Sequence, residues 1–344
     1  MSINAMNTSR GDGFLKDMIR YVLAVMVPVI ITMIWQWELA YICPTLVTVL
    51  VAPKAQVLSK HQVYSLLLAM LGSSIVSILL IGLIKPYPVV SIIATGWVLY
   101  WTFRFQAKGG SLLVALLWLL STLSYPAFAV LDMQFTINNI TGLLTSYSIA
   151  IAASIFCFAL IPNKNTVNQT RKSEEYNEHE VSRFALQNTL VLLPLFTAFI
   201  MFELQYGILF LIYASLLVTQ GSLNQGLKSL VGLMMANGLG GLVAIIAFEL
   251  SIMAPIAPFY MSVVLLFSMI FTYKTFTKGA LYSSAFSCFL ILLTDVTTTI
   301  GYSVDTFFYE RLLFIALANL YVLCAFIVLK AGNALKSSPK PIYS

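Results

Sequence analysis

The sequence predicts an all-α polytopic membrane protein, and three observations lead to that prediction. Of the 344 residues, 60% are hydrophobic. Only 9% are charged, whereas a soluble domain carries roughly a quarter charged residues. Apolar stretches of about 15 to 25 residues recur along the whole chain, and a helix needs about 20 residues to cross a hydrocarbon core of about 30 Å. Stretches of this length indicate a bundle of transmembrane helices.

Six apolar stretches in the first part of the chain predict six spans. The second is short, since about 14 residues reach only about 21 Å at 1.5 Å per residue. Pro28 lies inside the first span and is expected to kink it by removing a backbone donor. The expected boundaries are residues 18–37, 39–52, 63–84, 88–103, 111–131 and 137–161.

Six further stretches follow and repeat this plan. The second of them is again short, and Pro194 lies inside the first. The expected boundaries are residues 184–202, 206–219, 226–249, 255–273, 280–299 and 308–330. The fold class predicted is therefore all-α, with about twelve transmembrane helices.

The basic residues predict the orientation of these spans. An even number of spans places both termini on one side, and all Lys and Arg residues except Lys85 and Arg311 fall on that side. The positive-inside rule assigns such a side to the cytoplasm. We therefore expect a multi-pass protein of a bacterial inner membrane with both termini cytoplasmic.

Two short motifs indicate an internal repeat. "WELAY" (37–41) is matched by "FELQY" (202–206), and "FRFQAKG" (103–109) by "YKTFTKG" (273–279). The polar segment between them predicts a cytoplasmic linker at 162–183. The predicted domains are a six-helix repeat at 1–161 and another at 184–344. An even number of spans per repeat makes the repeats parallel, and such transporters enclose a path between their halves.

Each half resembles the membrane unit of the fusaric acid resistance and aromatic acid exporter superfamily. The features shared are an Arg before the first span ("IRYVLAVMVPVIIT", "SRFALQNTLVLL"), a short second span with a polar turn after it, and a third span rich in small residues ("LLAMLGSSIVS", "LMMANGLGGLVA"). One departure is that the chain lacks the large cytoplasmic domain that many full-length members carry after the first half. The first half also lacks the Arg that opens the last span of the second half ("YERLLFIALANL").

The resemblance implies efflux of small, often aromatic, organic acids across the inner membrane. It also implies a periplasmic adaptor of the membrane-fusion type, and we expect proton antiport to drive export. The expected partners are therefore an organic-acid substrate, the lipid bilayer and this adaptor; a homo-oligomer is compatible with the sequence. No nucleic acid partner is expected, because cytoplasmic loops explain the net charge of +6.

Asp295, Glu310 and Arg311 form the main candidate site. At 1.5 Å per residue, Asp295 lies about 24 Å along its helix from Gly279, and Arg311 lies about 29 Å from Lys330. These lengths place Asp295 and Arg311 at the outer edge of the membrane. The arginine fork suits a substrate carboxylate, and Asp295 or Glu310 could be the proton-binding acid, its pKa raised by burial. The alternative is that these charges anchor an outer loop.

Four further residues are candidates for the pathway. Asn237 lies mid-span in a glycine-rich segment, where its amide could bridge helices or contact substrate. Asn319 lies two turns inward from Arg311, near the same helix face. Glu38 and Glu203 occupy equivalent outer turns, which suit either a structural or gating turn or a pathway role.

Enzymatic chemistry and cofactors are not expected. No phosphate-binding GxxxxGK[ST] loop or Ser, His and Asp cluster occurs, and His61 and His179 stand alone, so no metal site is predicted. Three alternatives to a coupled exporter remain: an anion channel like the related plant malate channels, a major-facilitator transporter, and a non-transporting membrane scaffold. The major-facilitator alternative lacks the expected Gly-x-x-x-Asp-Arg pattern after the second span.

Overall fold

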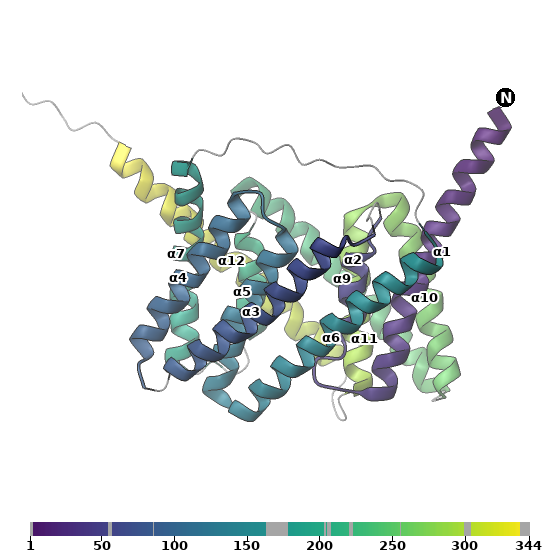
Figure 1. Cartoon of the computed structure of the whole chain (residues 1–344), viewed down its shortest axis with the longest axis horizontal. Coiled ribbons are helices and arrows are strands. Elements are labelled where there is room, and N and C mark those ends of the chain that lie inside the picture. Colours follow the sequence, from purple (N-terminus) through teal and green to yellow (C-terminus); the bar gives the residue numbers. More distant parts are fainter. Residues whose placement is uncertain are drawn as a thin grey trace, which may run out of the picture. The chain divides into compact units, whose positions relative to one another are not determined.

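The computed structural model describes residues 3–53, 57–84, 86–162, 178–202, 204, 208–219, 223–254, 256–298 and 304–337. These residues form twelve α-helices, which confirms the all-α prediction (Figure 1). In chain order they are α1 (Ile3–Trp35), α2 (Ile42–Leu50), α3 (Lys60–Ile84), α4 (Pro88–Ala107), α5 (Leu112–Leu131), α6 (Met133–Leu160), α7 (Glu178–Phe202), α8 (Ile208–Val218), α9 (Leu223–Met253), α10 (Ala257–Lys278), α11 (Ala280–Thr298) and α12 (Val304–Ser337).

Seven helices within the described residues are long and apolar enough to cross a membrane. They contain the segments Gly13–Trp35, Lys60–Ile84, Leu112–Val130, Met133–Leu160, Glu178–Phe202, Met234–Met253 and Ala257–Lys278. The chain is therefore a polytopic membrane protein. Helices α2 and α8 have 9 and 11 residues, or about 14 and 17 Å at 1.5 Å per residue. They are too short to cross alone, so the count of twelve spans stays a prediction.

Helices α4 and α10 begin and end with the same signals. Each has a proline in its first turn, Pro88 in α4 and Pro258 in α10, where the missing N–H removes no helical hydrogen bond. Gly109 and Gly279 end them with φ angles of 83° and 95°. A residue without a Cβ adopts this left-handed conformation at little cost.

The helices separate into two compact units. Unit 1 comprises Met1–Leu67, Ile137–Arg171 and Gly232–Leu312, and unit 2 comprises Leu68–Thr136, Lys172–Val231 and Leu313–Ser344. Each unit therefore combines chain from both halves of the sequence. Helices α3, α6, α9 and α12 contribute residues to both units.

Unit 1 is built around α1, α2, α10 and α11. Helix α1 packs against the other three, and α11 also packs against α2 and α10 (Figure 1). Its interior contains an aromatic cluster: the ring centroids of Phe271 lie 5.5 Å from Phe286 and 5.4 Å from Phe289. All three side chains are buried.

Unit 2 is built around α4, α5, α7 and α8. Helix α7 packs against the other three, and α5 also packs against α4 and α8. Helices α4 and α7 approach closely at Gly96, where an added Cβ would lie 3.2 Å from a Leu193 methyl carbon. The packing contacts of the two units correspond helix by helix: α1 corresponds to α7, α2 to α8, α10 to α4 and α11 to α5. Each pair of these helices that packs together in unit 1 has a counterpart pair in unit 2.

Candidate functional site

Arg20 is the only charged side chain that is buried among those the structure describes. It lies in α1 immediately before the apolar run that starts at Tyr21, and 4% of it is exposed. A charge inside a membrane-spanning segment is costly, so residues of this kind are candidates for function. Arg20 is therefore the starting point for the site.

Three groups of unit 1 surround the guanidinium. Its Nη2 atom lies 2.8 Å from Oδ1 of Asp17, one turn earlier on α1. Its Nη1 atom donates to the carbonyl oxygen of Ile161 at 3.4 Å, and its carbon lies 4.7 Å from the centroid of the Phe158 ring. Ile161 follows the end of α6, where carbonyl groups lack intrahelical partners and the helix dipole favours a cation.

One nitrogen of the guanidinium has no partner among the described residues. This nitrogen, Nε, is buried. Asp17 is 30% exposed, so an anion arriving from water can compete with this carboxylate for Arg20. The planar guanidinium can bind a carboxylate through two N–H groups. The adjacent phenylalanine ring suits a ligand that is also aromatic.

A hydroxyl network joins α1, α2 and α11 and includes Tyr21, the residue that follows Arg20. The Tyr21 hydroxyl donates to the carbonyl oxygen of Thr48 at 3.4 Å. The Thr48 and Ser287 hydroxyl oxygens are 3.0 Å apart. Tyr21 also forms a side-chain hydrogen bond with Ser283. The interior of unit 1 therefore contains hydrogen-bonded hydroxyl groups as well as apolar side chains.

Helix α10 adds three buried hydroxyl groups to this interior. Ser268, Thr272 and Thr275 lie at spacings of four and three residues, which places them on one helix face. Their hydroxyl oxygens are buried and have no hydrogen-bond partner among the described residues. An unsatisfied buried hydroxyl costs about 1–3 kcal/mol, so this face is suited to a polar solute or water.

The turn after α1 is held firmly by α6. Gln36 and Leu39 have φ angles of 36° and 60°, a left-handed conformation that costs a residue with a Cβ about 1–2 kcal/mol. The Trp37 indole Nε1 donates to the Ser146 hydroxyl at 2.8 Å. That hydroxyl donates to the Leu39 carbonyl oxygen at 3.0 Å. These contacts maintain the strained backbone.

Glu38 lies in this turn with its side chain exposed. Its carbonyl oxygen would lie only 2.0 Å from a Cβ added at Gly142 of α6. The backbone of Glu38 therefore has a packing role. A pathway role for its carboxylate stays a prediction.

The two predicted asparagines are buried in different units. Asn237 lies on α9 in unit 1 and is 3% exposed. Its backbone carbonyl oxygen accepts from the Cys288 thiol of α11 at 3.7 Å, and an added Cβ at Gly240 would lie 2.2 Å from the Ala285 carbonyl oxygen. The α9 segment of unit 1 therefore closely approaches α11. Asn319 lies on α12 in unit 2 and donates to the Ile315 carbonyl oxygen of its own helix at 2.7 Å.

The side chains of the four remaining predicted residues lie outside the described part of the structure. Asp295 lies near the end of α11, and Glu310 and Arg311 lie in the first turns of α12. Glu203 lies outside the described residues altogether. The proposed roles of these four residues stay predictions.

Sequence reasoning used Arg20 for the family resemblance but did not place it in the site. The available signal was an arginine three residues after Asp17 and directly before the long apolar run of α1. The decisive contacts come from Phe158 and Ile161, 138 and 141 residues further along the chain. No local pattern connects them to Arg20.

A family model described as "Protein of unknown function (DUF2955)" matches residues 17–157. The match begins at Asp17 and ends at Cys157, so it covers most of the segment from α1 to α6 and less than half of the chain. No curated protein and no solved structure matches the chain. The first half of this polytopic membrane protein is therefore similar to a family whose description assigns no activity.

Proposed function

We propose that this membrane protein is a secondary transporter of small organic acids, with aromatic carboxylates as the preferred class. The observation that supports this proposal is the burial of Arg20, whose guanidinium lies against Phe158 and beside the partly exposed Asp17. A cation next to an aromatic ring matches the charge and the apolar body of an aromatic carboxylate. No enzymatic step is part of the proposal.

Asp17 and the substrate compete for Arg20 in this proposal. Without substrate, the Asp17 carboxylate neutralises the guanidinium at 2.8 Å. A substrate carboxylate takes over part of this role and also uses the Nε–H that has no described partner. Loss of the Asp17 charge should therefore strengthen substrate binding, whereas loss of the Arg20 charge should weaken it.

The proposed architecture is two parallel six-helix repeats, at 1–161 and 184–344, joined by the linker at 162–183. Support comes from the exchange of α1, α2, α10 and α11 for α7, α8, α4 and α5, which preserves every helix pair within the units. The left-handed glycines that end α4 and α10 agree with it.

The burial patterns of α4 and α10 give further support. Ser91, Thr95 and Leu99 are buried on α4, as are Tyr260, Val264 and Ser268 on α10. Each of these α10 residues is numbered 169 higher than its α4 counterpart, whereas Gly279 is numbered 170 higher than Gly109. The buried face of α4 therefore recurs on α10, with a shift of one residue relative to the glycines that end the two helices.

The sequence predictions complete the proposed transport cycle. Arg20 receives the anion at the cytoplasmic end, and Arg311 meets it at the outer end. Asp295 or Glu310 exchanges the proton. The direction is export across a bacterial inner membrane, with both termini cytoplasmic and a periplasmic adaptor at the outer side.

Transport in proteoliposomes tests this proposal. An internal pH dye reports proton movement, and a panel of radiolabelled aromatic carboxylates reports substrate movement. Arg20→Gln should raise KM about tenfold, equivalent to about 1.4 kcal/mol, because the carboxylate loses its charged partner. Asp17→Asn should lower KM, and Arg20→Lys should fall between Arg20→Gln and the native protein because it keeps the charge but loses the fork.

Arg183→Gln is the matched control. Arg183 precedes the apolar run of α7 as Arg20 precedes that of α1, but its side chain is exposed, so its removal should leave KM within about twofold. Equal effects of Arg20→Gln and Arg183→Gln in correctly folded protein would contradict the assigned site. Anion current that follows voltage without proton movement would instead identify a channel. Arg311→Ala tests the outer site separately.

A further inference from the structure

Helix α4 carries an exposed apolar stripe. Val89, Ile93, Trp97, Trp101 and Phe105 recur every four residues, and each side chain is between 44% and 66% exposed. Residues at this spacing lie on one helix face. The stripe spans about 24 Å at 1.5 Å per residue. In a polytopic membrane protein, such a face is suited to contact with lipid hydrocarbon.

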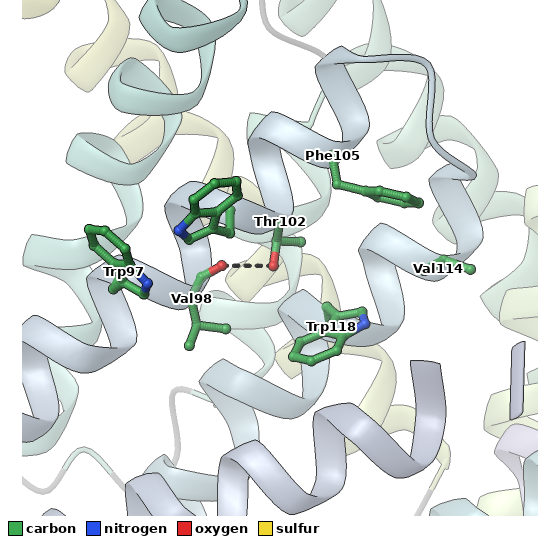
Figure 2. A pocket seen from close by; sticks show the side chains of 7 residues that line it. Trp97, Val98, Thr102, Phe105, Val114 and Trp118 are labelled. Atoms are coloured by element: carbon green, nitrogen blue, oxygen red, sulfur yellow. Dashed lines mark hydrogen bonds between the residues drawn. The ribbon is translucent and has the colours of Figure 1, made fainter. Parts of the chain in front are cut away.

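A cavity of about 340 Å³ lies at the end of this stripe, between α4 and α5 (Figure 2). Three of the chain's five tryptophans line it. The Thr102 hydroxyl also reaches the wall, but it donates to the Val98 carbonyl oxygen at 2.8 Å. The remaining lining is apolar: Trp97, Trp101, Trp118, Phe105, Val98 and Val114.

Two glycines of unit 2 shape this aromatic wall. Gly72 on α3 supports Trp118, because an added Cβ would lie 3.3 Å from the indole ring. Gly110 leaves room for Phe105, because an added Cβ there would lie 2.4 Å from that ring. Both distances are shorter than ordinary van der Waals contact. The positions of Trp118 and Phe105 therefore depend on glycine at these sites.

A cationic group lies directly beside the apolar cavity. The Arg104 guanidinium carbon is 5.1 Å from the ring centroid of Trp101, a lining residue. Arg104 and Lys108 both form ion pairs with Glu178 at the start of α7. Two positive charges share one carboxylate, so this group has a net charge of +1. An anionic group can therefore bind at the same end of the stripe.

We propose that this groove, defined by the six apolar lining residues together with Arg104 and Lys108, is a binding site for an anionic phospholipid of the surrounding bilayer. One acyl chain occupies the cavity and continues along the α4 stripe. The phosphate lies at Arg104 and Lys108. The proposal is independent of the transport function, because none of these residues belongs to the Arg20 site.

The combination of features favours lipid over a small aromatic acid. The apolar stripe continues about two turns beyond the cavity, from Trp97 back to Val89, so that cavity and stripe together offer a length that an acyl chain can use and a small acid cannot. The cations lie beyond the aromatic wall at the end of the helix, as expected for a headgroup next to its own chain. Basic pockets at helix ends bind anionic headgroups in this way.

Quenching of tryptophan fluorescence by brominated lipids tests the proposal. In the full-length Trp35→Phe/Trp37→Phe variant, the remaining tryptophans are Trp97, Trp101 and Trp118. This variant is reconstituted in phosphatidylcholine bilayers containing the same fraction of dibromo-phosphatidylglycerol or dibromo-phosphatidylcholine. We expect about a fivefold preference for the anionic lipid, the ratio that corresponds to about 1 kcal/mol per net charge. High salt should reduce this preference.

Removal of the cations provides the decisive comparison. Arg104→Gln/Lys108→Gln should abolish the preference while quenching by the neutral lipid continues. Lys274→Gln/Lys278→Gln is the matched control, because those lysines lie at the corresponding end of α10, and it should keep the preference. Equal quenching by both lipids would overturn the proposal. So would displacement of brominated phosphatidylglycerol by an added aromatic carboxylate, which would make the cavity a solute site.

Discussion

Helices α1 and α7 each contain an arginine followed by an aromatic residue at the point where the apolar run starts, but the surroundings of these two pairs differ. Arg20 precedes the apolar run of α1, which starts at Tyr21, and Arg183 precedes that of α7, which starts at Phe184. Arg20 and Tyr21 are buried, whereas Arg183 is exposed and Phe184 is half-buried. The chain therefore uses one sequence pattern in two environments.

The difference comes from the helix that covers each start. In unit 1, the end of α6 supplies Phe158 and the Ile161 carbonyl oxygen to Arg20. In unit 2, the end of α4 covers the start of α7 through Phe103, whose ring lies 6.5 Å from that of Phe184. The cations there belong to α4 and pair with an exposed glutamate. Neighbouring helices, rather than the local sequence, decide whether the arginine enters the core.

The largest expected effect comes from removing the close approach of α6 to the turn after α1. In Gly142→Ala, the new Cβ would lie 2.0 Å from the Glu38 carbonyl oxygen. We expect destabilisation of about 3 kcal/mol, as for strong overpacking, measured from the unfolding midpoint in SDS titration. Gly82→Ala is the control, since no atom lies within 4 Å of its added Cβ, and it should stabilise the helix by about 0.5–1 kcal/mol. Equal changes in the free energy of unfolding for the two variants would show that the packing of α6 against the turn after α1 contributes little to stability.

Replacement of the two arginines tests the comparison directly. Arg20→Met keeps an apolar stem but leaves the Ile161 carbonyl oxygen and Asp17 without this cation. We expect a loss of about 2 kcal/mol in the free energy of unfolding. Arg183→Met should change it by no more than about 0.5 kcal/mol, because that side chain is exposed. The same denaturation titration measures both, and a larger loss for Arg183→Met would reverse the interpretation.

A smaller effect is expected from the aromatic residue that follows each arginine. Tyr21→Phe removes the hydrogen bond to the Thr48 carbonyl oxygen and should cost about 1 kcal/mol. Phe184→Tyr adds a hydroxyl to a half-buried ring and should be close to neutral. Thermal unfolding followed by intrinsic fluorescence compares the two variants. A neutral Tyr21→Phe would show that the hydroxyl network contributes little to unit 1.

Much of the helical organisation could be predicted because it depends on local apolar composition. The number and order of helices follow from the apolar runs, and the short α2 and α8 were visible as short runs. Helix ends were harder to predict, as α4 continues through Arg104 to Ala107. Polar residues continue a helix when backbone hydrogen bonds allow it, so an apolar run underestimates helix length.

The candidate site could be predicted much less well because it depends on distant contacts. The burial of Arg20 depends on the end of α6, and the position of Trp118 on a glycine in α3. Asn319 was predicted as a pathway candidate from its place on the helix of Arg311, and the sequence did not show that its amide donates to the Ile315 carbonyl oxygen of its own helix. The pattern on α4 was accessible, since Trp97, Trp101 and Phe105 recur at helical spacing.

The composition of the two units also has a consequence for biosynthesis. When the ribosome has completed the first six helices, α1 and α2 still lack α10 and α11, and α4 and α5 still lack α7 and α8. Neither unit can close before helices from the second half are made. The early helices must therefore persist in the bilayer with incomplete partners, and assembly waits for contacts that are distant in sequence, which slow folding.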